Sequence, residues 1–353
     1  MKKYISICLL MFNITFIYSQ IPENDDNWQL EFEDEFTIPT LLDTYYSPRV
    51  YVNSLIHGDC AVSCTQELQC YQKANIEYQD GILKLVAKKE RIYERLNVFE
   101  PETAILSDGI QNKRWFDYTS GAIMTHSRES YGYFEIRCKI PKGKGFWPAF
   151  WLYHDPGCNK GREIDILELN GEASITANNY GATIHYSYIS GTECKGGSSG
   201  MQIQNLPDLS LDYHTYSVEW TPSKVLFYLD NKLVRFLNHT YVPSEGMHII
   251  VNLAIDPWYS PNFSNFVSKS LDIDYIKYYK LKMDCGDPIT SSEGNNFNFS
   301  NFDYKVKKSF SINNSTLIIG SKVTLRATDF IEFTQNFNVP IGAEFNAITV
   351  PCH

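Results

Sequence analysis

The chain has 353 residues, of which 43% are hydrophobic and 14% aromatic, enough for one large domain and a smaller one. Its 41 acidic residues outnumber the 31 basic ones, which gives a formal net charge of −10. This balance, with no basic stripe along the chain, argues against nucleic acid and against an anionic membrane surface as partners. The aromatic content is typical of all-β proteins, in which flat rings also stack on sugars.

The N-terminus has the layout of a secretory signal peptide. Two lysines precede an apolar run from Ile5 to Ile17, and the small residue Ser19 follows. The run is short for a membrane span, and no later segment reaches 18 apolar residues. We therefore assign residues 1–20 to a signal peptide and expect a secreted protein, extracellular, periplasmic or at the cell surface, with no membrane attachment after cleavage. A retained N-terminal anchor is the alternative.

Eight cysteines follow the signal peptide, an even number that suits disulfide bonding after export. Spacing does not determine connectivity, so two pairs are hypotheses: Cys158 with Cys194, and Cys285 with Cys352.

The other cysteines have simpler interpretations. Cys60, Cys64 and Cys70 lack a fourth ligand for a metal site, which favours disulfides that staple a loop. Cys138 lies in an expected strand, where we predict a buried free thiol.

From about Trp28 to Leu281, short β-type runs alternate with turn residues, and long helical periodicity is absent. In chain order the runs are WQLEFEDEF, GILKLVAKKE, GYFEIRCKI, GFWPAFWLY, REIDILEL, GATIHYSY, HTYSVEWTP, KVLFYLDNKLV, MHIIVNLAI and LDIDYIKYYK. This pattern predicts a two-sheet antiparallel sandwich, which we assign to residues 21–282.

The C-terminal part differs in composition. Residues 283–300 are rich in Gly, Asn and Ser and are assigned to a linker. Residues 301–353 contain a weak repeat, IGSKVTL from residue 319 and IGAEFNA from residue 341, a spacing of 22 residues. Such a repeat predicts a small module of stacked hairpins or solenoid-like rungs. Glycan binding, spacing and protection of the main domain remain open as its role.

The run GREIDILELNG, residues 161–171, places three acids in an otherwise apolar strand. Because side chains alternate along a strand, Glu163 and Asp165 share one face and Glu168 should point the other way. One extra residue after Asp165, a β-bulge, would bring all three acids onto one face, and bulges are frequent beside active sites. The alternative is a solvent-facing edge strand whose acids only aid solubility.

The preceding strand favours the first interpretation. KGKGFWPAFWLY places Trp147, Ala149 and Trp151 on one face, so two indoles can flank the acids. Glycosidic bond cleavage uses this combination, because rings stack on sugar faces while one carboxylate attacks and another protonates the leaving oxygen.

The WPAFW and EIDILE motifs together resemble glycoside hydrolase family 16, in its laminarinase-like branch. Supporting runs are LEFEDEF, QELQCY, YGYFEIRCKIPKGKG, GATIHY, YSVEWTP, IVNLAI and LDIDYIKYY. The resemblance implies an all-β fold, an antiparallel β-jelly-roll sandwich of the concanavalin A type with a concave glycan cleft. It also implies a retaining endo-hydrolase that cleaves β-1,3 glucan such as laminarin, or β-1,3-1,4-glucan.

The resemblance makes Glu163 the nucleophile and Glu168 the general acid/base, with Asp165 between them. A retaining displacement needs the two outer carboxyl groups about 5 to 5.5 Å apart. We expect the pKa of Glu168 to exceed that of Glu163, because negative neighbours disfavour its charged form. Substrate-binding positions are implied at Trp147, Trp151, His185, Gln66 and Trp220.

Each implied contact has a structural alternative. Core packing is the alternative for the tryptophans, and a hydrogen-bonded structural role is the alternative for His185. Gln66 stands where the family usually has asparagine. Trp258 and Tyr259 form either a distal subsite or a simple surface loop.

The resemblance further implies a structural calcium ion on the convex face, held by Asp274 with Glu35 and Gly81 as weaker companions, and no cofactor for catalysis. The expected partner is a β-glucan polysaccharide, and we expect a monomer. The alternatives are a hydrolase of agar, carrageenan or porphyran, a non-catalytic glycan-binding module on the same fold, and a transglycosylase.

Overall fold

The computed structural model describes residues 28–37, 46–47, 60–62, 67–98, 113–154, 157–221, 224–237, 240–259, 268–286, 289–291, 306–313, 316–317, 319, 322–334 and 336–350. In these ranges the chain is almost entirely β-structure, with one short α-helix, α2 (Ala173–Thr176), and a 3-10 turn at Lys73–Asn75. The predicted all-β class is confirmed. No helix within these ranges has the length and apolar character that a membrane crossing requires.

One layer of the main domain is an eight-stranded sheet in the order β18-β17-β16-β11-β20-β6-β5, with β1 also paired to β20. All its pairs are antiparallel. Its strands are β1 (Trp28–Asp34), β5 (Ile76–Gln79), β6 (Ile82–Ala87), β11 (Gly132–Lys139), β16 (His214–Trp220), β17 (Val225–Leu229), β18 (Lys232–Leu237) and β20 (Lys269–Leu281).

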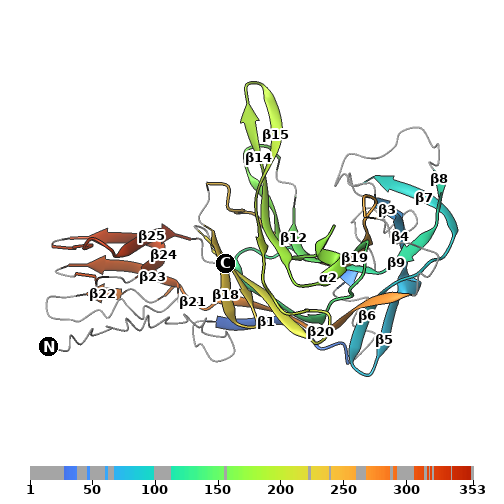
Figure 1. Ribbon diagram of the computed structural model, residues 1–353. Helices are drawn as coiled ribbons and strands as arrows, with labels where there is room; N and C mark the ends of the chain where they lie inside the picture. Colours follow the sequence, from blue (N-terminus) through green and yellow to red (C-terminus); the bar gives the residue numbers. More distant parts are fainter. Residues whose placement is uncertain are drawn as a thin grey trace, which may run out of the picture.

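The second layer is a seven-stranded antiparallel sheet in the order β15-β14-β13-β12-β19-β10-β2. Figure 1 shows its β14–β15 hairpin rising well beyond the rest of the layer. Its strands are β2 (Tyr46–Ser47), β10 (Ala122–Thr125), β12 (Phe146–Tyr153), β13 (Gly161–Glu168), β14 (Tyr180–Ser190), β15 (Glu193–Ile203) and β19 (His248–Ile255).

The main core lies between these two sheets. Alternate residues of facing strands meet there, including Phe134 and Ile136 of β11 and Phe150, Leu152 and Ile164 of β12 and β13, all buried. The free thiol of Cys138 is also buried in this core, as predicted. The predicted two-layer antiparallel sandwich is confirmed.

Two small sheets lie at one end of the sandwich (Figure 1). One joins β3 (Cys60–Val62), β7 (Ile92–Val98) and β8 (Lys113–Phe116), and the other pairs β4 (Gln69–Tyr71) with β9 (Tyr118–Ser120). Cys70 is disulfide-bonded, which agrees with loop stapling.

The C-terminal residues form a separate five-stranded sheet with its own core of Phe310, Ile312, Leu317, Val323, Leu325 and Ala327. Its strands are β21 (Met283–Asp284), β22 (Ile289–Ser291), β23 (Val306–Ile312), β24 (Lys322–Phe333) and β25 (Glu344–Thr349). All its described pairs are parallel, and Lys322 pairs with Glu344, an offset of 22 residues that equals the repeat spacing. Parallel pairing agrees with solenoid-like rungs and not with stacked hairpins.

This sheet corrects the assigned linker. Residues 283–300 were expected to connect two modules, but β21 and β22 lie within that range and pair with β23. These strands are only two and three residues long, too short for an alternating pattern to show in the sequence.

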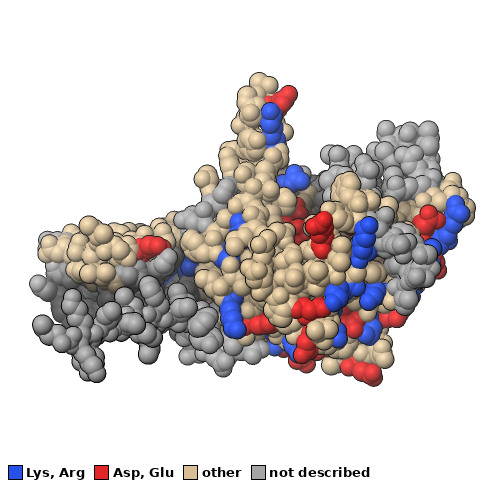
Figure 2. Space-filling model, viewed as in Figure 1, with Lys and Arg blue, Asp and Glu red and all other residues tan. Residues whose placement is uncertain are grey.

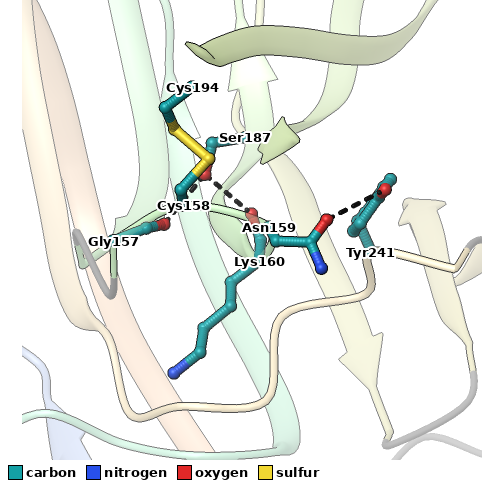
Figure 3. The surroundings of a disulfide bond; sticks show 7 residues. All are labelled: Gly157, Cys158, Asn159, Lys160, Ser187, Cys194 and Tyr241. Carbon is teal, nitrogen blue, oxygen red and sulfur yellow. Dashed lines mark hydrogen bonds between the residues drawn. A yellow bond between two sulfur atoms is a disulfide. The ribbon is translucent and has the colours of Figure 1, made fainter. Parts of the chain in front are cut away.

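The disulfide predicted between Cys158 and Cys194 is present (Figure 3). It ties the loop that enters β13 to the outer strand of the β14–β15 hairpin. Ser187 of β14 adds to this link, since its hydroxyl donates to the carbonyl oxygen of Gly157 at 2.8 Å. Cys285 is also disulfide-bonded, but Cys352 lies outside the described residues, so their pairing stays a prediction.

Candidate active site

Strand β13 contains the predicted bulge. On its β14 side, Asp165 pairs with Thr183 and Glu168 pairs with Gly181. The two acids are three residues apart on β13, whereas their partners are two residues apart on β14. The pairing with β12 shifts at the same place. The two residues between the acids are both buried in the core. The extra residue therefore turns Glu168 to the face that carries Glu163 and Asp165, which we call the acid face.

The acids on this face lie close together. Nε2 of His185, which pairs with Glu163 across the strands, lies 3.0 Å from Oδ2 of Asp165. Single ligand atoms of Glu163, Asp165 and His185 all lie within 4.8 Å of one another. In the described part of the chain, this is the one group of His, Cys, Asp and Glu side chains compact enough to hold a metal ion.

Burial raises the pKa of all three carboxyl groups, and it does so most strongly for Glu163 and Asp165. The negative charge of Asp165 raises the pKa of Glu163 further, and that of Glu168 acts in the same way on Asp165. Since no lysine or arginine of the described chain pairs with them, the site favours bound protons.

That the pKa of Glu168 exceeds that of Glu163 stays a prediction, because burial raises both pKa values. The charge of His185 lowers the pKa of both glutamates and does not distinguish them. Two donors act in the same direction: Nε1 of Trp147 at 3.1 Å and Nδ2 of Asn170 at 3.2 Å from Oε1 of Glu168. These two donors lower the pKa of Glu168 and hold its carboxyl group in place.

Both predicted indoles lie on the acid face. Trp151 pairs with Asp165 and Ala149 with Glu168, so Trp147 shares their side of β12. Both tryptophans are half-buried. Their placement beside the acids is as predicted, while their contact with sugar stays a prediction.

Trp220 is a correction. It is fully buried in the core, where its indole donates to the carbonyl oxygen of Pro243 at 2.8 Å and its ring packs near Phe134. It lies at the end of β16, in the other sheet, so it cannot contact a substrate on the acid face.

The remaining candidates are Gln66 and the loop of Trp258 and Tyr259. Gln66 lies outside the described residues. Trp258 is 68% exposed in the loop after β19, and the ring of Tyr259 lies close to Gly171. This loop follows the acid-bearing sheet, but a distal subsite there stays a prediction.

Sequence reasoning missed two buried polar residues on β19 and just after it. Asn252 pairs with Ala149 and so lies on the acid face. Asp256 accepts backbone hydrogen bonds from Gly171, Trp258 and Tyr259 at 3.1, 2.8 and 3.2 Å, and its charge raises the pKa of Glu168. The sequence does contain a signal for them, because Asn252 and Asp256 are the two polar residues in the otherwise apolar run IIVNLAID.

The calcium site stays a prediction. Asp274 forms an ion pair with Arg137, so its carboxylate already has a counter-charge that calcium would have to replace. Glu35 is exposed just after β1, and Gly81 lies in the β5–β6 turn with a positive φ of 80°. One paired carboxylate does not supply the several oxygen ligands that calcium prefers.

The molecular surface is notched between the β14–β15 hairpin and the side that carries β7 and β8 (Figure 2). Acidic side chains are visible at the base of this notch. The β14–β15 hairpin forms one flank of this notch.

The chain is similar to several known carbohydrate-active proteins. It is 33% identical over 172 residues to an endo-1,3-1,4-beta-glycanase of Rhizobium meliloti (strain 1021), with 48% of this chain and 35% of the relative covered, so it spans about a third of that relative. It is 26% identical over 313 residues to a beta-glucanase of Rhodothermus marinus, with 79% and 95% covered.

Among solved structures, the laminarinase catalytic domain of Thermotoga maritima MSB8 superposes with a TM-score of 0.54 at 27% identity, covering 72% of this chain and 99% of that domain. The model of the glycosyl hydrolases family 16 matches residues 65–263, more than half of the chain and all three acids. This chain therefore belongs to glycosyl hydrolase family 16.

Proposed function

We propose that the protein is a retaining, endo-acting β-glucan hydrolase that cuts β-1,3 linkages in laminarin-like polysaccharide, with β-1,3-1,4-glucan as the second glucan to test. The observation that carries the proposal is the bulge in β13, which brings Glu163 and Glu168 to one face beside two indoles. The beta-glucanase and laminarinase among the similar proteins support the choice of glucan.

In the first step, a carboxylate oxygen of Glu163 attacks the anomeric carbon while the bond to the departing sugar breaks. Glu168 gives its proton to the departing oxygen. Its raised pKa suits this role, because a general acid must hold its proton near neutral pH. The hydrogen bond from Trp147 holds the Glu168 carboxyl in place during the transfer.

In the second step, Glu168 takes a proton from water, and the resulting nucleophile attacks the anomeric carbon and releases Glu163. Attack in the first step requires ionised Glu163. The hydrogen bond between the two carboxyl groups raises the pKa of Glu163 and lowers that of Asp165, so Glu163 holds the shared proton and must pass it to Asp165 before it attacks. His185, whose Nε2 lies 3.0 Å from Oδ2 of Asp165, is placed to compensate negative charge on the Asp165 carboxyl group.

We also propose that the protein is exported. The signal-like N-terminus supports this. The Cys158–Cys194 disulfide does as well, since structural disulfides persist in oxidising compartments.

The test is incubation with a panel of laminarin, mixed-linkage glucan, agar, carrageenan and porphyran, followed by sizing of the products. We expect a ladder of oligosaccharides from laminarin, with the β-anomer as the first product in NMR spectra. Cleavage only of a galactan would refute the glucan assignment. Binding without cleavage would leave a glycan-binding module, and an α-anomer as first product would refute retention.

A further inference from the structure

The ELQCY segment, residues 67–71, is docked against the end of strand β19. The backbone N–H of Leu68 donates to the carbonyl oxygen of Ile255 at 3.1 Å. The N–H of Ile255 in turn donates to Oε1 of Gln69 at 2.6 Å. Glu67, Gln69 and Tyr71 are all buried, so their polar side chains depend on hydrogen bonds within the protein.

A chain of hydrogen bonds runs from this segment to Trp151. The indole Nε1 of Trp151 donates to Oδ1 of Asn252 at 2.8 Å. Nδ2 of Asn252 donates to the hydroxyl oxygen of Tyr71 at 3.0 Å. The Tyr71 hydroxyl donates to Oε2 of Glu67 at 3.2 Å, and Gln69 donates to the same oxygen at 2.6 Å.

Every hydrogen bond in this series has a defined donor and acceptor. The indole can only donate, and the Glu67 carboxylate can only accept, so the amide of Asn252 and the hydroxyl of Tyr71 must each accept on one side and donate on the other. Because Asn252 and Tyr71 are buried, a broken link would leave a polar group without water. The chain therefore fixes the orientation of the Asn252 amide and of the indole it holds.

Packing restrains the same indole from another side. Trp151 contacts a cluster of Met124, Tyr153 and Ile250, and its ring meets that of Tyr153 edge-on at 5.7 Å between centroids. One ring edge is therefore held by Asn252 and one side by apolar contacts, while the residue remains half-exposed on the acid face.

We propose that Glu67, Tyr71 and Asn252 are positioning residues that set the orientation of Trp151 and thereby the binding of glycan beside Asp165. The inference rests on the proposed function only in its last part, the contact of Trp151 with glycan. It assigns a role to the ELQCY segment, which reaches Trp151 through Asn252.

The first experiment measures the orientation of Trp151 without substrate. The indole N–H resonance of Trp151 is identified in a ¹H–¹⁵N spectrum by its loss in Trp151→Phe. Tyr71→Phe breaks the chain in its middle and should shift this resonance and speed the exchange of its proton with water. Tyr216→Phe is the matched control, because the Tyr216 hydroxyl is buried in the other sheet without a hydrogen-bond partner among the described residues.

The second experiment separates binding from chemistry on whichever polysaccharide of the panel is cleaved. Tyr71→Phe should raise KM about threefold to tenfold, with kcat within about twofold and an unchanged pH profile, since it weakens ground-state positioning alone. The control Tyr216→Phe should retain both the wild-type resonance and the wild-type KM.

The outcomes are distinct. An unshifted Trp151 resonance in folded Tyr71→Phe would overturn the positioning role, whether or not any glycan is cleaved. A shifted resonance with unchanged KM would overturn the link to glycan binding. If no polysaccharide is cleaved, the proposed function fails, and the resonance still decides whether the chain positions Trp151.

Discussion

Strands β13 and β20 carry similar acidic patterns, and each contains a register shift, yet their acids lie in opposite environments. In β20, Asp272 pairs with Lys84 at 2.7 Å and Asp274 pairs with Arg137, and both pairs are partly exposed. In β13, Asp165 is buried and Glu163 and Glu168 are half-buried, and in the described chain their compensation comes from His185, an indole and an amide.

This difference separates structural carboxylates from functional ones. A carboxylate on the convex face with a neighbouring base is a surface ion pair of small energetic value. A cluster of buried carboxylates without such a base costs stability and holds protons, which is an arrangement typical of catalytic sites. The sequences EIDILE and LDIDY do not reveal this contrast, because the counter-charges come from other strands.

The largest expected effect is that of Glu163→Gln. It should lower turnover on the order of 10⁴-fold or more, because the nucleophile is lost. The Tm at neutral pH should not fall, since one member of a repelling cluster is removed. Initial rates and thermal unfolding curves measure both, with Asp272→Asn of β20 as the matched control. A variant that cleaves at the normal rate would refute the assignment.

Glu168→Gln should lower the hydrolysis of polysaccharide about 10²- to 10⁴-fold, the usual contribution of a general acid. The loss should be much smaller with an aryl glycoside whose leaving group needs no proton. The alkaline limb of the pH profile should also disappear. An equal loss on both substrates would indicate that Glu168 is not the proton donor.

Asp165→Asn tests the charge cluster through stability. A raised folded-state pKa means that the folded protein keeps protons that the unfolded chain loses above about pH 4. Stability therefore falls as pH rises from there through the raised folded-state pKa. The Tm of the variant should exceed that of the wild type increasingly toward alkaline pH, by about 2 to 4 °C per kcal/mol of repulsion removed. A gain that is largest in acid would contradict this.

Calcium binding at Asp274 would make the Tm depend on calcium. If the site exists, calcium at about 100 times its dissociation constant stabilises the fold by about 2.7 kcal/mol, and a chelator removes this gain. Asp274→Asn should abolish the difference. An identical wild-type Tm with calcium and with chelator would exclude the site.

The smallest effect is expected for Asp272→Asn. Loss of its partly exposed ion pair with Lys84 should cost less than about 1 kcal/mol of unfolding free energy, and the kinetics should not change. Chemical denaturation and initial rates measure this. A large loss of activity would mean that the two acidic strands are not functionally different.

The sequence predicted those features of the site that depend on one strand or on neighbouring strands. The out-of-phase Glu168 indicated the bulge, and the spacing of Trp147 and Trp151 indicated their shared face. The 22-residue repeat indicated a module of stacked hairpins or solenoid-like rungs, and the parallel pairing agrees with the second.

Features that depend on contacts between distant segments were missed. Trp220 sits in an aromatic strand motif much like that of Trp151, but its strand belongs to the other sheet and its ring faces the core. Tyr71 and Asn252 are 181 positions apart and meet only after folding. The hydrogen bonds from Trp147 and Asn170 to Glu168 were missed for the same reason, since they form only in the folded protein.

The most direct test of the central claim is covalent trapping. A 2-deoxy-2-fluoro laminari-oligosaccharide with an activated leaving group slows release of the glycosyl-enzyme, and peptide mass spectrometry then identifies the modified residue. The account predicts a single sugar ester on Glu163, with trapping unchanged in Asp272→Asn. A sugar ester on Glu168 or on any other residue, or turnover of the probe without any ester, would contradict the account.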